Sequence, residues 1–136
     1  MKIVYFVRHA KSSWEDMSLR DIDRPLNPRG KRDAPFMAKL LKGKGVKADA
    51  IISSPANRAF STASVFAAEL EVKKEDIRVK DQIYEAYTND VLDVISNLED
   101  DLETVLIFGH NPTFTSLANM FSKDYIPNVP TCGIAK

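Results

Sequence analysis

Cysteine is nearly absent from this chain of 136 residues, in which Cys132 is the single example. One thiol excludes an internal disulfide framework and is typical of proteins from a reducing compartment. No apolar run approaches the roughly 20 residues that a membrane-spanning helix needs, and charge appears too early for a signal peptide. We therefore expect a soluble cytoplasmic protein without membrane association.

The chain also has a formal net charge of zero at pH 7. Lys and Arg together number 19, and so do Asp and Glu, which argues against a general nucleic-acid binder. The signs are nevertheless unevenly distributed, with 13 basic and 6 acidic residues in 1–68 against 6 and 13 in 69–136. If the basic residues of the first half gather on one face, that face would attract an anionic ligand. The alternative is that most of these charges are solvated surface.

Several catalytic motifs are missing. The two histidines form no His-x-x-x-His unit, so the sequence lacks the spaced ligands of a zinc hydrolase. Cys132 is not followed by an arginine-containing loop, which excludes a cysteine phosphatase. Neither a P-loop nor a G-x-G-x-x-G motif is present, so the common nucleotide-binding folds are not indicated. We expect neither a metal nor a cofactor.

Apolar runs alternate with helical patterns along the chain. Strands are predicted at 2–7, 50–52 and 104–108, with weaker ones at 77–80 and 131–135. Helices are predicted at 55–70, 90–98 and 112–121, preceded by one around 34–41. This alternation predicts an α/β protein, a three-layer α/β/α fold with a mostly parallel central sheet, in a single domain over residues 1–136. Because the sequence stops inside a predicted strand, the prediction leaves open whether the natural chain continues.

Proline marks the expected starts of the helices. Ser54 and Asn111 are predicted N-caps, each followed by a proline that can take the first helical position. The first helix is ambiguous, because a start at Pro28 would place Pro35 inside it at a cost of about 3 kcal/mol. That helix is therefore expected either to begin near Asp33 or to be kinked.

Basic and imidazole side chains follow three of the predicted strands, at the point where each ends. Arg8 and His9 follow the first strand, Arg58 lies in the first turn of the helix after the second, and His110 follows the third. In an α/β sheet, ligands bind at the carboxyl ends of the strands, where helix N-termini also favour anions. Each residue alone would be interpreted as structural or as surface. Their equivalent positions together indicate a site for a dianion such as a phosphoryl group.

Five motifs carry a resemblance to a known family. They are VRHAKSSW at 7–14, DRPLNPRG at 23–30, SSPANRAFSTA at 53–63, YEA at 84–86 and GHNP at 109–112. With these motifs the chain resembles the histidine phosphatase superfamily, which has the phosphoglycerate mutase-like fold, and most closely its SixA-type phosphohistidine phosphatase branch. The motifs are spread over most of the chain in the family's order.

The resemblance implies a metal-independent phosphatase that works through a covalent intermediate. In this interpretation neutral His9 attacks phosphorus and becomes phosphohistidine, and water then releases inorganic phosphate. Arg8, Arg58 and His110 would bind the non-bridging oxygens, where phosphoryl transfer needs charge stabilisation. Glu85 matches the family's proton donor, and a solvated loop glutamate is the alternative interpretation of that residue.

The preferred substrate is phosphohistidine on a partner protein, as the resemblance to the SixA branch implies. Two alternatives remain open, namely a broad small-molecule phosphomonoesterase and a phosphate-binding regulatory protein with little turnover. The expected partner is accordingly a phosphorylated protein or a small phosphate ester, with no nucleic acid or membrane involved. The sequence leaves the oligomeric state undetermined.

Three further side chains have predicted structural roles. Arg24 and Arg29 are expected to stabilise the proline-rich turn in which they lie, and the alternative is that they line the approach to the anion site. Their predicted ion-pair partners are Asp21 and Asp23. Trp14 is expected to be buried or to pack on a loop rather than to serve as a substrate platform.

Overall fold

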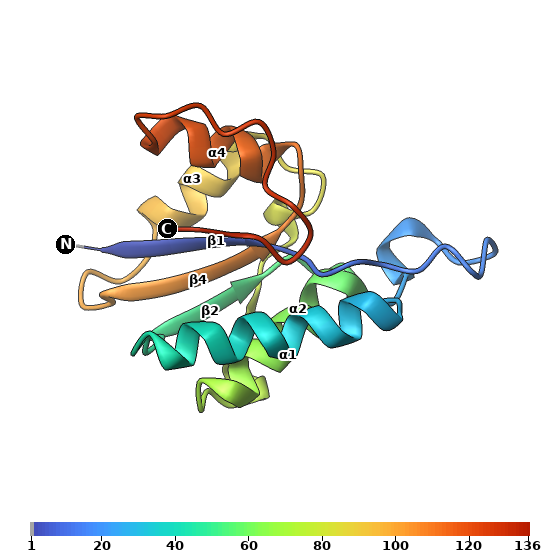
Figure 1. The fold of residues 1–136 in the computed structure, drawn as a ribbon. Coiled ribbons are helices and arrows are strands. Elements are labelled where there is room, and N and C mark those ends of the chain that lie inside the picture. The colour runs from blue at the N-terminus through green and yellow to red at the C-terminus, as the bar shows by residue number, and fades with distance from the viewer. Residues whose placement is uncertain (1) are drawn as a thin grey trace.

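A computed structural model describes residues 2–136, which contain a five-stranded sheet (Figure 1). Its strands are β1 (Ile3–Arg8), β2 (Ala50–Ser53), β3 (Arg78–Val79), β4 (Thr104–Gly109) and β5 (Ile134–Ala135). They lie in the order β3-β2-β4-β1-β5, and every neighbouring pair is parallel except β1 with β5. The prediction of a mostly parallel sheet is therefore confirmed.

Helices cover both faces of the sheet. Those described within residues 2–136 are α1 (Pro28–Gly43), α2 (Asn57–Glu69), α3 (Thr88–Ser96) and α4 (Thr113–Phe121). α1 and α2 pack on one face and α3 and α4 on the other (Figure 1), which divides the buried side chains into two groups. This confirms the three-layer α/β/α arrangement. None of the helices described for residues 2–136 is both long and apolar enough to cross a membrane.

The central strands are buried on both faces, because alternate side chains of each strand contact different helical layers. Val7, Leu106 and Phe108 pack with α1 and α2. Phe6 and Ile107, which directly precede Val7 and Phe108 along their strands, lie on the opposite face and pack with α3 and α4. The near-continuous apolar runs that predicted these strands are thus a consequence of burial from both sides.

α1 begins at Pro28, so the later of its two predicted starts is wrong and Pro35 lies inside the helix. Asn27 caps this end, since its side-chain oxygen accepts a hydrogen bond from the backbone N–H of Gly30 at 2.8 Å. Gly30 is required there, because a Cβ at this position would overlap the carbonyl oxygen of Lys11. This close approach packs the first turn of α1 against the segment that leaves β1.

α2 begins at Asn57, two residues later than predicted. The predicted cap, Ser54, does not cap the helix. Its Oγ accepts a hydrogen bond from the backbone N–H of Ala56 at 3.2 Å and lies 2.8 Å from Nε2 of His110. The capping prediction is wrong here because this serine is engaged by the histidine at the neighbouring strand end.

α4 begins at Thr113, and Pro112 takes the N-cap position. Asn111 therefore lies one residue before the N-cap position that was predicted for it. Its Oδ1 nevertheless accepts hydrogen bonds from the backbone N–H and the hydroxyl of Thr115, at 3.1 and 2.9 Å. Asn111 also donates from Nδ2 to the carbonyl oxygen of Val129 at 3.0 Å, which ties the start of α4 to the segment that leads into β5.

Candidate active site

The carboxyl ends of β1 and β4 bring the two histidines to one place. Arg8 pairs with Gly109 in the parallel register, so His9 and His110 are the next residues on adjacent strands. A hydrogen bond from the backbone N–H of His9 to the Gly109 carbonyl, at 3.0 Å, extends the pairing, and the ring centroids are 5.2 Å apart. Gly109 leaves no room for a side chain, since a Cβ would lie 2.5 Å from the Phe114 ring. The two imidazoles therefore lie side by side.

His9 is held in one tautomer. Its Nδ1 lies 2.8 Å from the carbonyl oxygen of Ala10, and because a carbonyl only accepts, Nδ1 carries the proton and Nε2 the lone pair. Ala10 is fixed by its own N–H, which donates to Oγ1 of Thr62 at 3.0 Å. Burial, opposed by the bond to Ala10 and reinforced by Arg58 and Arg8, lowers the pKa of His9 from 6.5 to about 4. The ring is therefore neutral near physiological pH, with Nε2 available as a nucleophile.

His110 is also held neutral. Burial, reinforced by the neighbouring His9, lowers the pKa of His110 from 6.5 to about 3. Its Nε2 lies 2.8 Å from Oγ of Ser54, while its Nδ1 is buried without a hydrogen-bond partner among residues 2–136. The ring of Tyr84 packs edge-on against it, with centroids 5.7 Å apart. If Ser54 donates to Nε2, Nδ1 carries the proton and is a donor without a partner among residues 2–136.

Two arginines complete the cluster. Arg8 donates from Nη1 to the carbonyl oxygen of Val129 at 3.1 Å, and its Nε is buried and unpartnered within residues 2–136. Arg58 is buried and donates to Asp21 twice, from Nη1 to the carbonyl oxygen at 2.7 Å and from Nη2 to the carboxylate at 2.9 Å. Buried polar atoms without partners call for an explanation, and a bound anion is one that fits guanidinium and imidazole N–H groups. The cluster therefore has the chemistry of a phosphate site.

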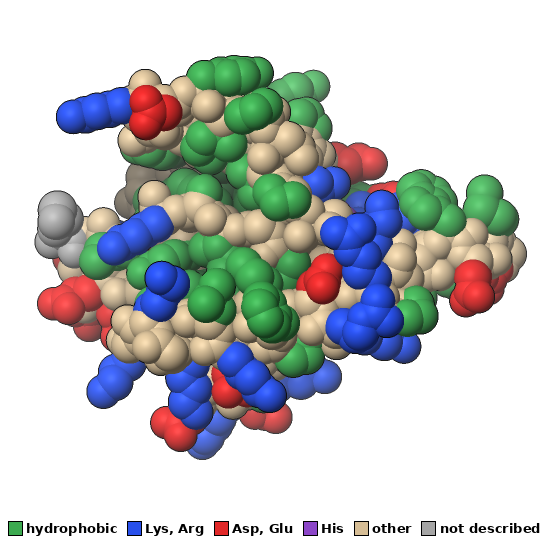
Figure 2. Space-filling view, viewed as in Figure 1, with side chains coloured by type: hydrophobic (Ala, Val, Ile, Leu, Met, Phe, Trp, Pro, Cys, Tyr) green, Lys and Arg blue, Asp and Glu red, His purple; other side chains and the backbone are tan. Residues whose placement is uncertain are grey.

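Basic side chains gather on one face of the molecule, near the segment that precedes α1. Figure 2 shows a group of Lys and Arg side chains between the body of the molecule and the projecting segment that precedes α1. Figure 1 shows that the arrowheads of β1, β2 and β4 point toward the same side. The arginines that act on the charge of His9, which are Arg58, Arg8 and Arg24, all belong to the basic first half of the chain.

Comparisons with known proteins agree with this geometry. The family model of the histidine phosphatase superfamily (branch 1) matches residues 4–93, which include His9 and Arg58. The chain belongs to the histidine phosphatase superfamily. His110 lies beyond the matched range, and its place beside His9 follows from the strand register instead.

Two relatives extend the match along most of the chain. An uncharacterized chloroplastic protein of Arabidopsis thaliana is 33% identical over 137 residues, which cover 95% of this chain and 62% of the relative. An uncharacterized protein of Mycobacterium tuberculosis is 34% identical over 112 residues, covering 82% of this chain and 67% of the relative. The chain thus spans less than two thirds of the length of the Arabidopsis protein.

Two solved structures share the fold. A crystal structure from Agrobacterium tumefaciens, assigned as the phosphohistidine phosphatase SixA, matches with a TM-score of 0.85 and 31% identity over 96% of this chain and 86% of that one. The protein histidine phosphatase SixA in complex with tungstate matches with a TM-score of 0.83 and 23% identity over 95% and 83%. These likenesses confirm the family fold predicted from the motifs.

Glu85 is placed differently from the other four predicted residues. Its side chain is exposed and its backbone has a φ of 54°, in the left-handed region. No hydrogen bond or ion pair of this side chain is found within residues 2–136, whereas the adjacent Tyr84 contacts His110. The structure thus leaves the proton-donor role of Glu85 as a prediction.

The structural roles predicted for the proline-rich turn are partly confirmed. Arg24 is buried and pairs with Asp21 at 3.0 Å, as predicted. Arg29 pairs with Asp33 at 3.4 Å, so its predicted pairing with the acids of the turn is wrong. Trp14 is 62% exposed rather than buried, yet it does pack on the turn, with the guanidinium of Arg24 3.3 Å from its ring centroid.

Two contacts at the site were missed by sequence reasoning. One is the carboxylate of Asp21 on Arg58, and the other is the ring of Tyr84 on His110. The two are connected, since the Tyr84 hydroxyl donates to the Asp21 carboxylate at 2.7 Å. Both residues lie in or beside the motifs that were recognised. A motif names residue types, however, and does not say which neighbours from other segments they reach.

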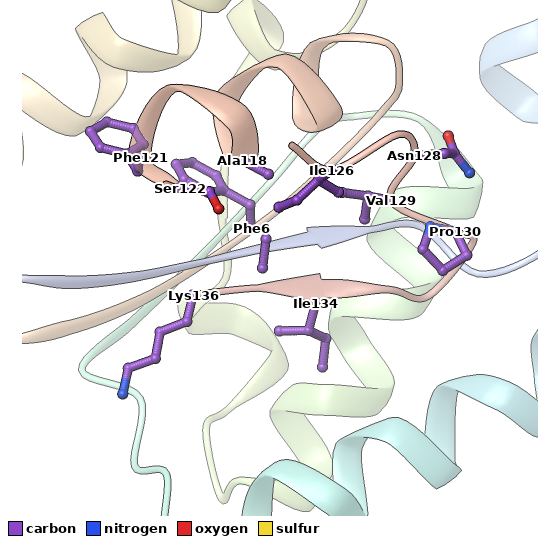
Figure 3. A pocket seen from close by; sticks show the side chains of 11 residues that line it. Phe6, Ala118, Phe121, Ser122, Ile126, Asn128, Val129, Pro130, Ile134 and Lys136 are labelled. Carbon is purple, nitrogen blue, oxygen red and sulfur yellow. The ribbon is translucent and has the colours of Figure 1, made fainter. Parts of the chain in front are cut away.

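A cavity of about 360 Å³ lies beside the site rather than at it (Figure 3). It is lined by residues of β1, α4, β5 and the segment between α4 and β5: Phe6, Ala118, Phe121, Ser122, Ile126, Asn128, Val129, Pro130, Ile134, Ala135 and Lys136. Val129 connects it to the site, because the carbonyl of this residue binds Arg8. The anion site is therefore defined by polar side chains and not by this hollow.

The depressed pKa of His9 predicts how stability depends on pH. Between pH 6.5 and about 4 the unfolded chain binds a proton at this position that the folded chain does not, so stability falls as the pH falls through this window. From pH 7 to pH 5 we expect a loss of about 2 kcal/mol in the free energy of unfolding from His9 alone. Urea unfolding at pH 7 and at pH 5 measures this change in the free energy of unfolding. A His9→Asn variant should show a smaller loss, and an equal loss would contradict the assignment.

Proposed function

We propose that this protein is a metal-independent phosphatase that uses His9 as its nucleophile and acts on phosphohistidine carried by a partner protein. The observation that carries the proposal is the state of His9. Its Nδ1 is committed to the Ala10 carbonyl and its pKa is depressed, so an unprotonated Nε2 is present without a separate base. Arg8, Arg58 and His110 surround it with groups that bind phosphate oxygens.

The reaction has two steps. In the first, the lone pair of Nε2 forms a bond to phosphorus while the bond from phosphorus to the leaving nitrogen breaks. The leaving imidazole, already protonated on its other nitrogen, keeps the electron pair of that bond and departs as a neutral ring. In the second, water attacks phosphorus, the bond from Nε2 to phosphorus breaks, and inorganic phosphate leaves with His9 restored. The guanidinium groups of Arg8 and Arg58 stabilise the charge that spreads over the non-bridging oxygens in both steps.

The leaving group favours phosphohistidine over an ester. An alkoxide needs a proton from a positioned acid, which contributes roughly 10²–10⁴ in rate. Glu85, the predicted acid, is exposed, and no hydrogen bond or ion pair that would orient its side chain is found within residues 2–136. An imidazole that is already protonated leaves as a neutral ring and depends less on such an acid. The likeness to the Agrobacterium SixA structure at 31% identity supports the same substrate class.

A substrate panel tests the proposal. Phosphate release would be measured from a phosphohistidine peptide, from an alkyl phosphate ester and from an aryl phosphate ester, each with and without a chelator. We expect turnover of the phosphohistidine peptide to exceed that of the alkyl ester by at least about 10²-fold, because the alkoxide that leaves from the ester needs a proton from a positioned acid. The chelator should have no effect on any of them.

The remaining outcomes separate the alternatives. Equal or faster turnover of the esters would identify a broad phosphomonoesterase and make Glu85 the next residue to test. Activity that is lost with the chelator would contradict the metal-independent mechanism. Phosphate binding without release from any substrate would leave a phosphate-binding regulatory protein as the better account.

A further inference from the structure

The carboxylate of Asp21 lies among groups of the active site that come from three different segments. It accepts hydrogen bonds from Nη2 of Arg58 at 2.9 Å, from Nη1 of Arg24 at 3.0 Å and from the hydroxyl of Tyr84 at 2.7 Å. Arg58 belongs to the first turn of α2, and Tyr84 follows the short turn η3 (Asp81–Ile83). One acidic side chain therefore connects the proposed phosphate-binding arginine to two other elements.

The backbone around Asp21 is docked on α2 independently of this carboxylate. Asp21 belongs to the short turn η1 (Asp21–Asp23), whose carbonyl oxygens accept hydrogen bonds from both of the first two residues of α2. Nη1 of Arg58 donates to the carbonyl of Asp21 at 2.7 Å, and Nδ2 of Asn57 donates to the carbonyl of Asp23 at 3.1 Å. The two Nη groups of Arg58 are thus fixed by one residue, once through its backbone and once through its side chain.

We propose that Asp21 is a positioning residue that fixes the guanidinium of Arg58 in the orientation that binds the phosphoryl group. The inference rests on the proposed function, because it assigns Asp21 a role through Arg58 and not through contact with the substrate. A guanidinium that rotates freely at the end of a flexible side chain stabilises a transition state much less than an oriented one does. Two fixed hydrogen bonds remove that freedom. No hydrogen bond from Nε of Arg58 is found within residues 2–136, so this edge remains available to a phosphate oxygen.

The carboxylate keeps its charge over the range in which the protein would work. Burial would raise the pKa of Asp21, but the hydrogen bonds from Tyr84, Arg58 and Arg24 outweigh it and lower that pKa to about 2. Asp21 is therefore a permanent acceptor for Arg58. A permanent negative charge next to an anion site has a second physical consequence, which is that it can compete with phosphate for Arg58. The two roles predict opposite changes in phosphate affinity when the charge is removed.

The test compares Asp21→Asn with Asp23→Asn. Both substitutions remove one negative charge from the same turn, but within residues 2–136 the only ion pair of the Asp23 side chain is with the exposed Arg20, at 2.8 Å. The backbone bond from Arg58 to residue 21 survives in both variants. Steady-state kinetics with a phosphohistidine peptide would give kcat and KM, and titration calorimetry with inorganic phosphate would give its affinity without requiring turnover.

We expect kcat/KM of Asp21→Asn to be about 10-fold or more below that of Asp23→Asn, with weaker phosphate binding, because Arg58 is no longer held. Tighter phosphate binding in Asp21→Asn than in Asp23→Asn would overturn the proposal and show a competing anion instead. Equal behaviour of the two variants would also overturn it. Because phosphate binding is measured separately, a wild-type protein that binds phosphate but turns nothing over would count against the proposed function and still test Asp21.

A second comparison shows whether Asp21 acts through Arg58. In an Arg58→Ala background, Asp21→Asn should bring no further loss of kcat/KM or of phosphate affinity. The same loss in both backgrounds would mean that the carboxylate does not act through Arg58, which would contradict the proposal. Thermal unfolding of each variant separates this result from a general loss of folded protein, since a merely structural defect lowers the melting temperature in both backgrounds alike.

Discussion

Replacing His9 with alanine is expected to lower phosphate release by at least about 10⁴-fold, because the substitution removes the atom that forms the covalent intermediate. The residue is buried in the structure, and the one hydrogen bond found for its side chain within residues 2–136 is that from Nδ1 to the Ala10 carbonyl. Binding of phosphate or tungstate should survive, since Arg8, Arg58 and His110 remain in place. Kinetics with a phosphohistidine peptide and calorimetry with tungstate measure the two effects separately.

The covalent intermediate provides a direct check of the same prediction. Wild-type protein that is rapidly quenched with base during turnover should carry one acid-labile phosphate, and mass spectrometry should place it on His9. His9→Ala should carry none. Turnover that persists in His9→Ala would exclude this residue as the nucleophile, whatever the affinity for tungstate. As a control, replacement of the exposed Lys11 by alanine should leave both the phosphate labelling and the turnover near the wild-type level.

The parts of the site that local sequence predicts are those determined by single strands. His9 and His110 each follow an apolar run that is buried on both faces, so their positions at strand ends follow from periodicity and length alone. Their contact requires only that β1 and β4 be parallel neighbours in register, which the general rules of α/β sheets favour. This is why an anion site could be predicted before any fold was known.

The parts that local sequence does not predict depend on pairs of residues far apart along the chain. Asp21 meets Arg58 across 37 positions and Tyr84 across 63 positions. Nothing in the composition of either segment specifies these contacts. Ser54 illustrates the same limit, because it has the local pattern of a helix cap and is instead engaged by His110. The predicted partner of Arg24 was correct because Asp21 is only three residues away.

Removing the guanidinium of Arg58 is the second large expected effect. Arg58→Ala should lower kcat/KM by roughly 10²–10³-fold, which is the loss typical of removing one preorganised donor to a developing charge. Arg58→Lys should recover only part of this activity, because lysine restores the charge but not the planar pair of donors. Arg29→Ala is the matched control. Arg29 is also a first-turn arginine of a helix, but its side chain is 63% exposed and pairs with Asp33, so we expect activity within about 2-fold of wild type.

The three arginine variants together distinguish charge from geometry. If Arg58 acted only as a distant positive charge, Arg58→Lys would match the wild type and Arg29→Ala would show a measurable loss. If it acts through directed hydrogen bonds, as its fixed Nη groups indicate, the lysine variant should remain well below the wild type and the effect should appear in kcat as well as in KM. Loss confined to KM would mean that Arg58 binds substrate and transition state equally, and the charge stabilisation would then have to come from Arg8 and His110.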